Sequence, residues 1–373
     1  MKIIHFSDTH LGYSEYHKVD PDTGINQREQ DFYNAWNHVI DAILTHKPDM
    51  VIHAGDLFHT TRPGNRAIAV ALEGIQKLSD AGIPLVFVSG NHSTPKIRST
   101  GSIFESISLF PNVYAAYRSR YERFRISRCD VHCVPHCSLT EDLEKAFGEI
   151  DIQKDAEKNV LVTHGSWAGN KAYSMGEFNE QHIADPEGQL GLTFDYIALG
   201  HYHKHLEISD HIVYSGSTER TSFNEAGYTS GYVIVDLVNS IHTYHEIPFR
   251  EMLRLPSLAC EQLTASEIYS ALEKISTPDL EQKLVSLELR DIQHDTFLKL
   301  DWREIDARFK QVFHLEKSFS QAKREGEVSG SSSFDSLPVE FERYADRIEL
   351  QDLDAERLKR LGLEYLSLEL DDR

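Results

Sequence analysis

Five apolar segments of this chain are each followed directly by polar side chains that can bind metal ions. The side chains are Asp8, His10, Asp56, Asn91, His164, His201 and His203. A mixture of imidazole, carboxylate and amide donors suits manganese, iron or zinc better than calcium or magnesium. One ion does not usually take this many ligands from a protein. Two ions about 3.5–4 Å apart can share a carboxylate and catalyse hydrolysis. The residue types therefore predict a two-metal hydrolase.

The segments that precede these side chains have the composition of buried strands. Residues 50–54 are mostly apolar without alternation, which is typical of a strand buried on both faces. Gly55 then allows a tight turn and leaves Asp56 at the carboxyl edge of a sheet, where open α/β folds bind ligands. Apolar residues at helical spacing predict helices over 28–45 and 67–78, between the first three strands. This alternation of strands and helices predicts a layered α/β fold.

The chain is long enough for more than one domain, because single hydrophobic cores stop growing at about 250–300 residues. A capping box at Thr264 and Glu267 opens a predicted helix that runs to Ile275. Residues 302–313 fit either a second helix or a helix followed by a strand, so a small α+β unit follows the first domain. The expected divisions are 1–248 for the catalytic domain, 249–322 for the α+β domain, 323–336 for a serine-rich flexible linker and 337–373 for a helical tail.

Composition limits the class of protein. With 40% hydrophobic and 26% charged residues the chain is typical of globular proteins. A formal net charge of −21 argues against a protein that coats nucleic acid by bulk electrostatics, although bound cations can reverse the local sign at a nuclease site. No apolar run is long enough for a membrane span, and the N-terminus lacks the pattern of a signal peptide, so we expect a cytoplasmic protein.

Three further groups of residues invite a functional interpretation and are better explained by structure. Cys129, Cys133 and Cys137 lack the paired spacing of zinc sites, so we predict ordinary buried cysteines. Five arginines between 118 and 128 could form a phosphate-binding ridge, but charge runs usually face water, and we predict a solvated, charge-balanced strand face. His5 and His53 lie within apolar strands and are expected to be core histidines with satisfied rings.

The ordered motifs also carry a family resemblance. Asp8-x-His10, Gly55-Asp56, Gly90-Asn91-His92, His164-Gly165 and Gly200-His201-x-His203 follow one another as in the calcineurin-like metallophosphoesterases. Within that superfamily the chain resembles the SbcD-type double-strand-break repair nucleases, with further similarity at Leu57-Phe58-His59 and over 214–220. The resemblance covers residues 1–247, and residues 249–320 resemble that family's capping domain more loosely.

The resemblance implies a metallophosphoesterase β-sandwich flanked by helices, with a smaller capping domain that binds DNA or orients substrate. The resemblance implies two manganese ions. One would be held by Asp8, His10, Asp56 and His203, and the second by Asp56, Asn91, His164 and His201. His92 would act as general acid or stabilise the phosphate, and His59 would contact the scissile phosphate. Arg62, Lys96 and Arg98 are the expected substrate-binding cations. The family usually has an acidic residue after Gly-Asn-His, whereas this chain has Ser93, which would make His92 less basic.

The function implied by the resemblance is that of a DNA nuclease in double-strand-break repair. It would act as a 3′–5′ exonuclease on duplex ends and as an endonuclease on single strands. The tail would join an SMC-like coiled-coil ATPase, and the helix over 28–45 would form a homodimer. A small-molecule phosphatase or cyclic-nucleotide phosphodiesterase on the same fold is the alternative. A non-enzymatic scaffold is disfavoured, because no ligand position is lost.

Overall fold

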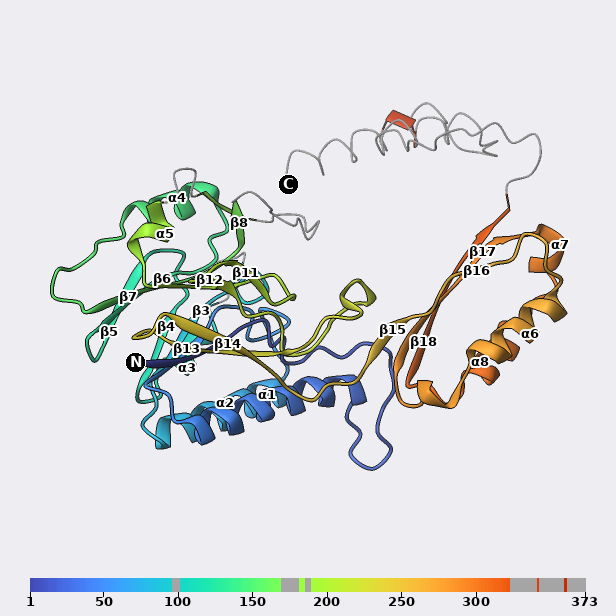
Figure 1. The fold of residues 1–373 in the computed structure, drawn as a ribbon, viewed down its shortest axis with the longest axis horizontal. Helices are drawn as coiled ribbons and strands as arrows, with labels where there is room; N and C mark the ends of the chain where they lie inside the picture. Colours follow the sequence, from blue (N-terminus) through green and yellow to red (C-terminus); the bar gives the residue numbers. More distant parts are fainter. Residues whose placement is uncertain (96–100, 169–180, 185–188, 323–340, 342–358, 361–373) are drawn as a thin grey trace.

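The computed structural model describes residues 1–95, 101–168, 181–184, 189–322, 341 and 359–360. Within these residues the chain forms a larger unit, to which the N-terminus belongs, and a smaller unit built from residues beyond 250 (Figure 1). The predicted linker over 323–336 and nearly all of the predicted tail over 337–373 lie outside the described residues. Among the described helices, none combines the length and apolarity that crossing a membrane would need.

The first sheet of the larger unit contains the N-terminal strand at its centre. Among the described residues its six strands are, in spatial order, β14 (Ile241–Glu246), β13 (Gly231–Asp236), β1 (Lys2–Phe6), β2 (Met50–His53), β3 (Leu85–Val88) and β4 (Val113–Ala116). Strands β1 to β4 run parallel to one another, and β13 and β14 form an antiparallel hairpin beside β1. Because β1 to β3 are parallel, their carboxyl ends meet at one edge of the sheet.

The second sheet has a mixed arrangement with a parallel centre. Its six strands in the described part of the chain are, in spatial order, β11 (Leu206–Ser209), β12 (Ile212–Tyr214), β10 (Tyr196–Gly200), β7 (Lys158–His164), β6 (Cys129–Val134) and β5 (Glu122–Ile126). Strands β6, β7, β10 and β12 are parallel. A separate ribbon pairs β8 (Ser166–Ala168) with β9 (His182–Ala184).

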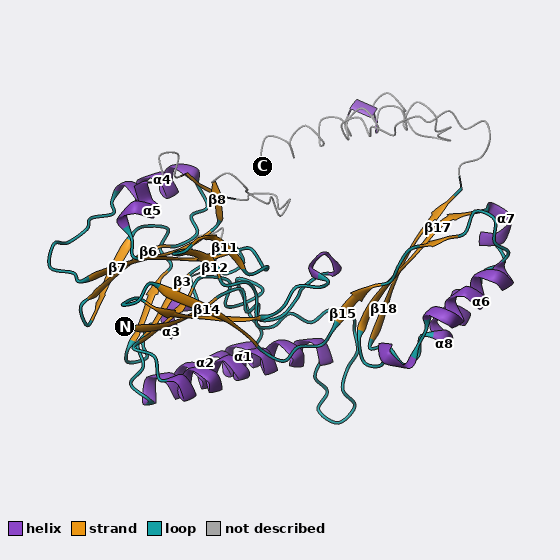
Figure 2. Cartoon of the chain, viewed as in Figure 1, coloured by secondary structure: helices purple, strands orange, loops and turns teal. Residues whose placement is uncertain are grey.

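The two sheets pack face to face, with helices on their outer faces (Figure 2). Buried aliphatic side chains from both sheets, such as Ile52 and Val160, form the layer between them. The outer face of the first sheet is covered by α1 (Gln27–His46), α2 (Asn65–Asp80) and α3 (Phe104–Ile107), and that of the second by α4 (Thr140–Gly148) and α5 (Gln189–Thr193). Burying one such aliphatic side chain contributes about 1.5–3 kcal/mol, so this layered core holds the sheets together. The predicted layered sandwich is confirmed.

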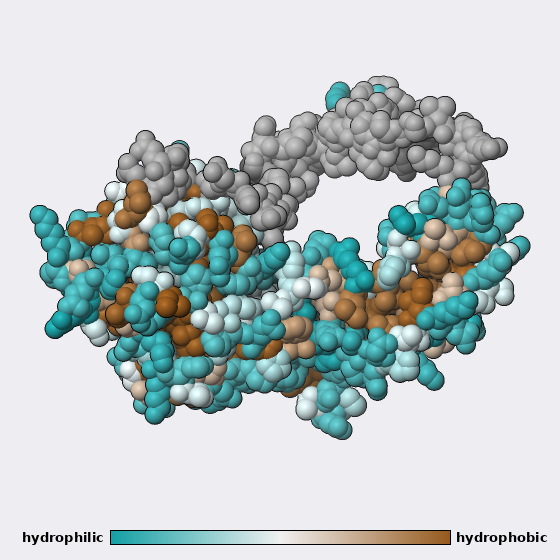
Figure 3. Space-filling view, in the orientation of Figure 1, coloured by the Kyte–Doolittle hydropathy of each residue, from teal (hydrophilic) through white to brown (hydrophobic). Residues whose placement is uncertain are grey.

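The smaller unit, which we call the cap, has its own sheet and hydrophobic core. Strand β17 (Leu284–Ile292) pairs in parallel with β15 (Met252–Arg254) and β16 (Leu258–Ala259) on one side and with β18 (His314–Gln321) on the other. Its helical elements are α6 (Ala265–Ile275), the 3-10 turn η3 (Pro278–Leu280), α7 (His294–Phe297) and α8 (Trp302–Arg308). The predicted capping box at Thr264 is present, and the segment over 302–313 is a helix that leads into a strand. Apolar side chains also reach the surface of the cap (Figure 3), Leu298 and Phe319 among them.

The cysteines and the arginine-rich strands behave as predicted. All four cysteines are buried and free, and burial raises the pKa of Cys129 and Cys137 to about 12. The arginine-rich strands carry a charge-balanced face, where Arg125 pairs with both Asp130 and Asp155. These observations favour a structural role for both groups.

The prediction for the two core histidines needs correction. His5 and His53 are fully buried, and burial lowers the pKa of each ring to about 3, so both are neutral. His5 bonds the Tyr196 hydroxyl and His53 bonds the Thr9 hydroxyl, each through one nitrogen. The other nitrogen of each ring has no hydrogen-bond partner among the described residues, so these rings are only half satisfied.

Candidate metal centre

The predicted ligands converge at one edge of the sandwich, although they come from five separate strands. The loops after β1, β2 and β3 supply ligands from the first sheet, and the end of β7 and the loop after β10 supply them from the second. All of these ligands are buried except Asn91, which is half-buried. The carboxyl ends of parallel strands in both sheets therefore form one shared site, as expected for an α/β fold.

The backbone at this edge is held in an uncommon conformation. Asp8, His10, Asp56 and His201 all have positive φ, at 51°, 40°, 53° and 108°. Such angles cost on the order of 1–3 kcal/mol each outside glycine and are concentrated at functional sites. The backbone of the loop after β1 bonds to that after β2, since Asp8 N donates to Gly55 O at 3.0 Å and His10 N donates to Asp56 O at 3.0 Å. These bonds hold the strained residues in place.

Asp8, His10 and His203 form the first acid–imidazole cluster, with ligand atoms within 4.8 Å of one another. Nε2 of His10 lies 3.0 Å from Nε2 of His203. On its other side, His203 donates its Nδ1–H to Oε1 of Glu225 at 3.0 Å. Nε2 of His203 is therefore the ring nitrogen that could bind a metal ion, and it faces the centre of the cluster.

Asp8, Asp56 and His164 form the second cluster, which shares Asp8 with the first. His164 donates its Nδ1–H to the Ala54 carbonyl at 2.9 Å, and its Nε2 lies 3.2 Å from Oδ2 of Asp56 and 2.9 Å from Oδ1 of Asn91. His201 is joined to the group through its backbone N–H, which donates to the carboxylate of Asp8 at 3.1 Å. Three further predicted ligands thus lie around Asp8 and Asp56.

This donor set fits divalent cations. In both clusters a histidine has committed its Nδ1–H to an acceptor outside the centre, so its Nε2 faces other electron-pair donors. Facing electron pairs repel one another unless a proton or a metal cation lies between them. Histidine ligands of metals are usually held in this way, by a carboxylate or carbonyl that accepts the other ring N–H.

The electrostatics of the site also favour positive charge at its centre. Burial alone would lower the pKa of His164 and of His203, yet the Asp56 carboxylate raises the first to about 9 and the Glu225 carboxylate raises the second to about 9. Burial would raise the pKa of Asp56, but His164 and the neighbouring imidazoles hold it well below its usual range. Burial lowers the pKa of His10 well below its usual range, so that ring is neutral.

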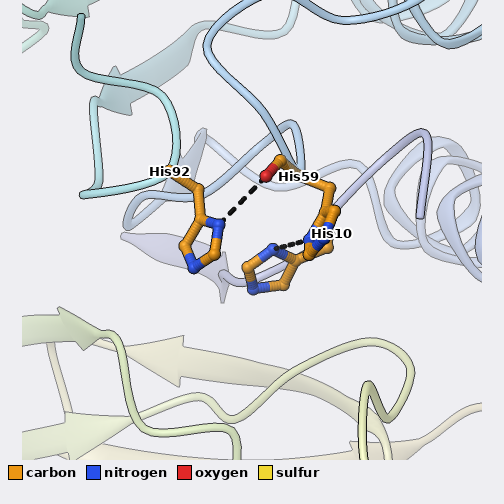
Figure 4. A group of neighbouring side chains, drawn as sticks. All are labelled: His10, His59 and His92. Carbon is orange, nitrogen blue, oxygen red and sulfur yellow. Dashed lines mark hydrogen bonds between the residues drawn. The ribbon is translucent and has the colours of Figure 1, made fainter. Parts of the chain in front are cut away.

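His59 and His92 lie beside the first cluster, next to His10 (Figure 4). The rings of His59 and His92 stack at 5.3 Å, and Nδ1 of His92 donates to the His59 carbonyl at 3.0 Å. The backbone N–H of His92 also donates to Oδ1 of Asp56 at 2.9 Å. Burial lowers the pKa of His59 to about 4. Both half-buried rings are therefore fixed at the side of the cluster.

The hydroxyl of Ser93 takes no part in this arrangement. It is buried and has no hydrogen-bond partner among the described residues, and His92 bonds the His59 carbonyl instead. Of the predicted substrate-binding cations, Arg62 is exposed in the loop after His59, while Lys96 and Arg98 lie outside the described residues.

Glu225 is a site residue that the sequence did not predict. It is buried on the 3-10 turn η2 (Phe223–Glu225), where it accepts the Nδ1–H of His203. No short motif contains it, since it lies 22 residues beyond His203 and not at a strand end. Nothing in the sequence distinguishes it from Glu219 in the same loop.

Comparison with known proteins also indicates a metal-dependent phosphoesterase. A family model described as calcineurin-like phosphoesterase matches residues 1–205. The chain is 30% identical over 312 residues to the DNA double-strand break repair protein Mre11 of Thermoplasma acidophilum, covering 79% of each chain. It is 30% identical to the protein of that name in Methanococcus maripaludis and 28% identical to that in Haloferax volcanii, spanning 59% and 61% of their lengths.

The similarity to a solved structure is too weak to support an assignment of function. The protein TT1561 of Thermus thermophilus aligns with 66% of this chain and 99% of its own at 14% identity and a TM-score of 0.41. Because the family model covers more than half of the chain and the Thermoplasma relative aligns along most of it, this chain belongs to the calcineurin-like phosphoesterases and is a metal-dependent phosphoesterase.

Proposed function

We propose that this enzyme is a nuclease that hydrolyses phosphodiester bonds of DNA with two bound divalent ions. The observation that carries the proposal is the pair of acid–imidazole clusters that share Asp8, with His59 and His92 fixed beside them. The names of the Mre11 relatives point to double-strand-break repair as the process. Exonuclease action on duplex ends and endonuclease action on single strands are the activities that we assign to it.

We assign the residues that would hold the ions as the family resemblance implies. Asp8, His10 and His203 would bind one ion, and Asn91, His164 and His201 the other, with Asp56 between the two. Manganese is the ion that we propose, because a donor set rich in imidazole suits it better than calcium or magnesium. When bound, the two ions would activate a water for in-line attack on phosphorus and neutralise the developing charge.

His92 is the residue that we propose as general acid. Its Nδ1–H is engaged by the His59 carbonyl, so the ring cannot turn freely and Nε2 is left to carry the proton that the leaving oxygen needs. His59 stacks on this ring and would contact the phosphate beside it. Asp56 links the proposed metal site to the proposed general acid, because its carboxylate accepts the backbone N–H of His92.

The function is tested by comparing two substrates with metal-stripped enzyme to which Mn²⁺ is returned. One is linear duplex DNA labelled at one end, and the other is bis-p-nitrophenyl phosphate, a generic phosphodiester. We expect Mn²⁺-dependent release of nucleotides from the DNA. If the enzyme hydrolyses the generic ester but leaves the DNA intact, the result would support a small-molecule phosphodiesterase and contradict the nuclease.

The proposed partners are an SMC-like coiled-coil ATPase, bound through the tail over 337–373, and a second copy of this chain, bound through α1. Removal of residues 323–373 leaves β18 and its pairing with β17 intact. If the truncated protein still cleaves a short DNA but no longer binds the ATPase, the tail is the docking segment. If the truncated protein aggregates, the tail belongs to its own core and the docking proposal fails.

A further inference from the structure

The turn η2 lies between the cap and the metal centre, and its three residues contact different parts of the molecule. Phe223 is buried in a small apolar cluster whose other buried members, Met252, Leu284 and Phe313, all come from the cap. This cluster is separate from the main core of the cap. The first residue of the turn therefore packs against the cap, with Tyr16 of the larger unit partly buried beside it.

The cap also holds η2 by hydrogen bonds from one side chain. Arg254, the last residue of β15, donates Nε–H to the Phe223 carbonyl at 2.8 Å and Nη2–H to Oδ1 of Asn224 at 2.7 Å. Two bonds from one planar guanidinium fix direction as well as distance. The backbone of the turn is thus tied to the first strand of the cap.

The third residue of the turn, Glu225, forms a hydrogen bond with a proposed metal ligand. Oε1 of Glu225 accepts the Nδ1–H of His203 at 3.0 Å and the hydroxyl of Thr221 at 2.6 Å, and Oε2 accepts the Thr221 backbone N–H at 3.0 Å. Glu225 is only 4% exposed, so water does not compete for these bonds. The carboxylate has one defined position relative to the His203 ring.

The same loop receives a second set of contacts from the start of the cap. Arg220 donates to the Arg250 carbonyl and stacks over Phe249 at 4.1 Å, while the Arg250 guanidinium pairs with Asp31 of α1 at 2.7 Å. In the same loop, the Glu219 carboxylate accepts hydrogen bonds from the guanidinium groups of Arg28 and Arg220. The loop over 219–225 is therefore joined to the cap at Arg220, Phe223 and Asn224, while Asp31 and Lys18 supply further polar contacts between the larger unit and the cap.

We propose that Glu225 is a positioning residue for His203, and that η2 transmits the placement of the cap to the metal centre. Three consecutive residues contact the small apolar cluster at the edge of the cap, the Arg254 side chain and His203, a proposed ligand of the first ion. A change in cap orientation, such as one caused by DNA bound to it, would move the Glu225 carboxylate and with it the His203 ring. The inference rests on His203 being a metal ligand, as proposed above.

The test uses the full-length protein and measures the Mn²⁺ dissociation constant by calorimetry. Glu225→Gln keeps the shape of the side chain and removes its charge, and we expect affinity to fall by about 10- to 100-fold, the usual effect of losing such a carboxylate. Glu225→Asp keeps the charge but shortens the side chain, and its affinity should fall between those of Glu225→Gln and wild type. Wild-type affinity in Glu225→Gln would overturn the positioning role.

Transmission from the cap is tested at a distance from the ligands with Arg254→Gln. The matched control is Arg303→Gln, another arginine of the cap, which pairs only with Asp301 among the charged groups described and does not contact η2. We expect Arg254→Gln to weaken Mn²⁺ binding several-fold and to shift the imidazole ¹⁵N resonances of His203 in the metal-free protein, with Arg303→Gln unchanged. If both variants match wild type in both measurements, the cap does not act through η2.

These measurements are independent of the substrate. An enzyme that binds Mn²⁺ and responds to Arg254→Gln but leaves DNA intact would contradict the proposed nuclease function and support the coupling. An enzyme that cleaves DNA normally in every variant, with unchanged Mn²⁺ affinity and His203 resonances, would contradict the coupling and support the nuclease.

Discussion

His92 and Ser93 are neighbours in the chain, and the structure gives them different surroundings. His92 bonds the Asp56 carboxylate through its backbone and the His59 carbonyl through its ring. The hydroxyl of Ser93 is buried without a partner in the described structure. The acidic residue that the family usually has after Gly-Asn-His is thus replaced by one that does not bond the histidine ring.

His92→Ala is expected to lower turnover by about 10²- to 10⁴-fold, the usual contribution of a general acid, while leaving Mn²⁺ occupancy unchanged. Steady-state kinetics and metal analysis of the purified variant would measure both. Ser93→Ala is the matched control and should retain wild-type turnover. Loss of metal in His92→Ala would show that this histidine is a ligand and not an acid.

Protons and metal ions are expected to compete at His164 and His203. The pKa of each is raised to about 9, so both rings are protonated in the metal-free protein at neutral pH and must lose a proton to present Nε2 to an ion. Affinity for Mn²⁺ should therefore rise with pH and level off once the pH exceeds these pKa values. Calorimetry in buffers of different ionisation enthalpy should detect protons released on binding, and binding without proton release would contradict the assignment of these ligands.

The sequence was sufficient to predict that the proposed ligands converge, because each follows an apolar strand, and parallel strands bring their carboxyl ends together. It was not sufficient for Glu225, whose role depends on a turn that the cap holds in place. Nor could it show that His5 and His53 each leave one nitrogen without a partner among the described residues, since that depends on which side chains of the folded protein face them.

At the scale of elements, the close approach of loops at the sheet edge depends on glycine. A Cβ on Gly55, whose φ is 106°, would lie 2.1 Å from Nδ1 of His164, and one on Gly90 would lie 2.3 Å from Oδ1 of Asp56 and 2.7 Å from its backbone nitrogen. The loops after β2 and β3 can therefore meet at Asp56 only without side chains at these positions. This requirement explains the glycine in two of the motifs.

Gly90→Ala is expected to displace the Asp56 carboxylate and to lower both Mn²⁺ affinity and turnover by at least about tenfold, the effect typical of disturbing a ligand's supports. The backbone nitrogen of Asp56 cannot move aside as a flexible side chain would. Gly64→Ala is the control, because a Cβ there would meet nothing within 4 Å. The two variants would be compared by Mn²⁺ titration and kinetics. Equal, wild-type behaviour of both would show that the loop tolerates a Cβ and that the steric argument is wrong.

The elements themselves were largely predictable, whereas their lateral order was not. Helical spacing placed the ends of α1 and α2 close to where the structure has them. The capping box placed the start of α6, because Thr264 and Glu267 satisfy the first backbone N–H groups locally. By contrast, β13 lies beside β1 although most of the larger unit separates them in the sequence, and no local pattern encodes that pairing.

At the scale of the whole molecule, the metal centre is shared between the two sheets of the sandwich. Asp8, His10 and Asp56 come from the first sheet, and His164 and His203 come from the second sheet and its loops. An ion held by both groups would bind only when the sheets are packed together. Metal binding and the stability of the sandwich are therefore linked.

Saturating Mn²⁺ is expected to raise the thermal unfolding midpoint of the protein. A ligand at about 100 times its dissociation constant stabilises the folded state by about 2.7 kcal/mol. Differential scanning calorimetry of the metal-stripped protein, with and without Mn²⁺, would measure the shift. Asp56→Asn should show a much smaller shift, and an equal shift in that variant would place the stabilising ion elsewhere.

The most direct test of the two-metal account is the stoichiometry and activity of Asp56→Asn. The carboxylate of Asp56 is the group that we propose to be shared by the two ions, and a neutral amide cannot bridge two cations as a carboxylate does. Mn²⁺ titration and hydrolysis of both DNA and bis-p-nitrophenyl phosphate would be measured on metal-stripped wild type and variant. We expect two ions per wild-type chain, fewer in the variant, and no hydrolysis of either substrate by the variant. Near-wild-type turnover in Asp56→Asn, or a single ion in a fully active wild type, would contradict the two-metal mechanism.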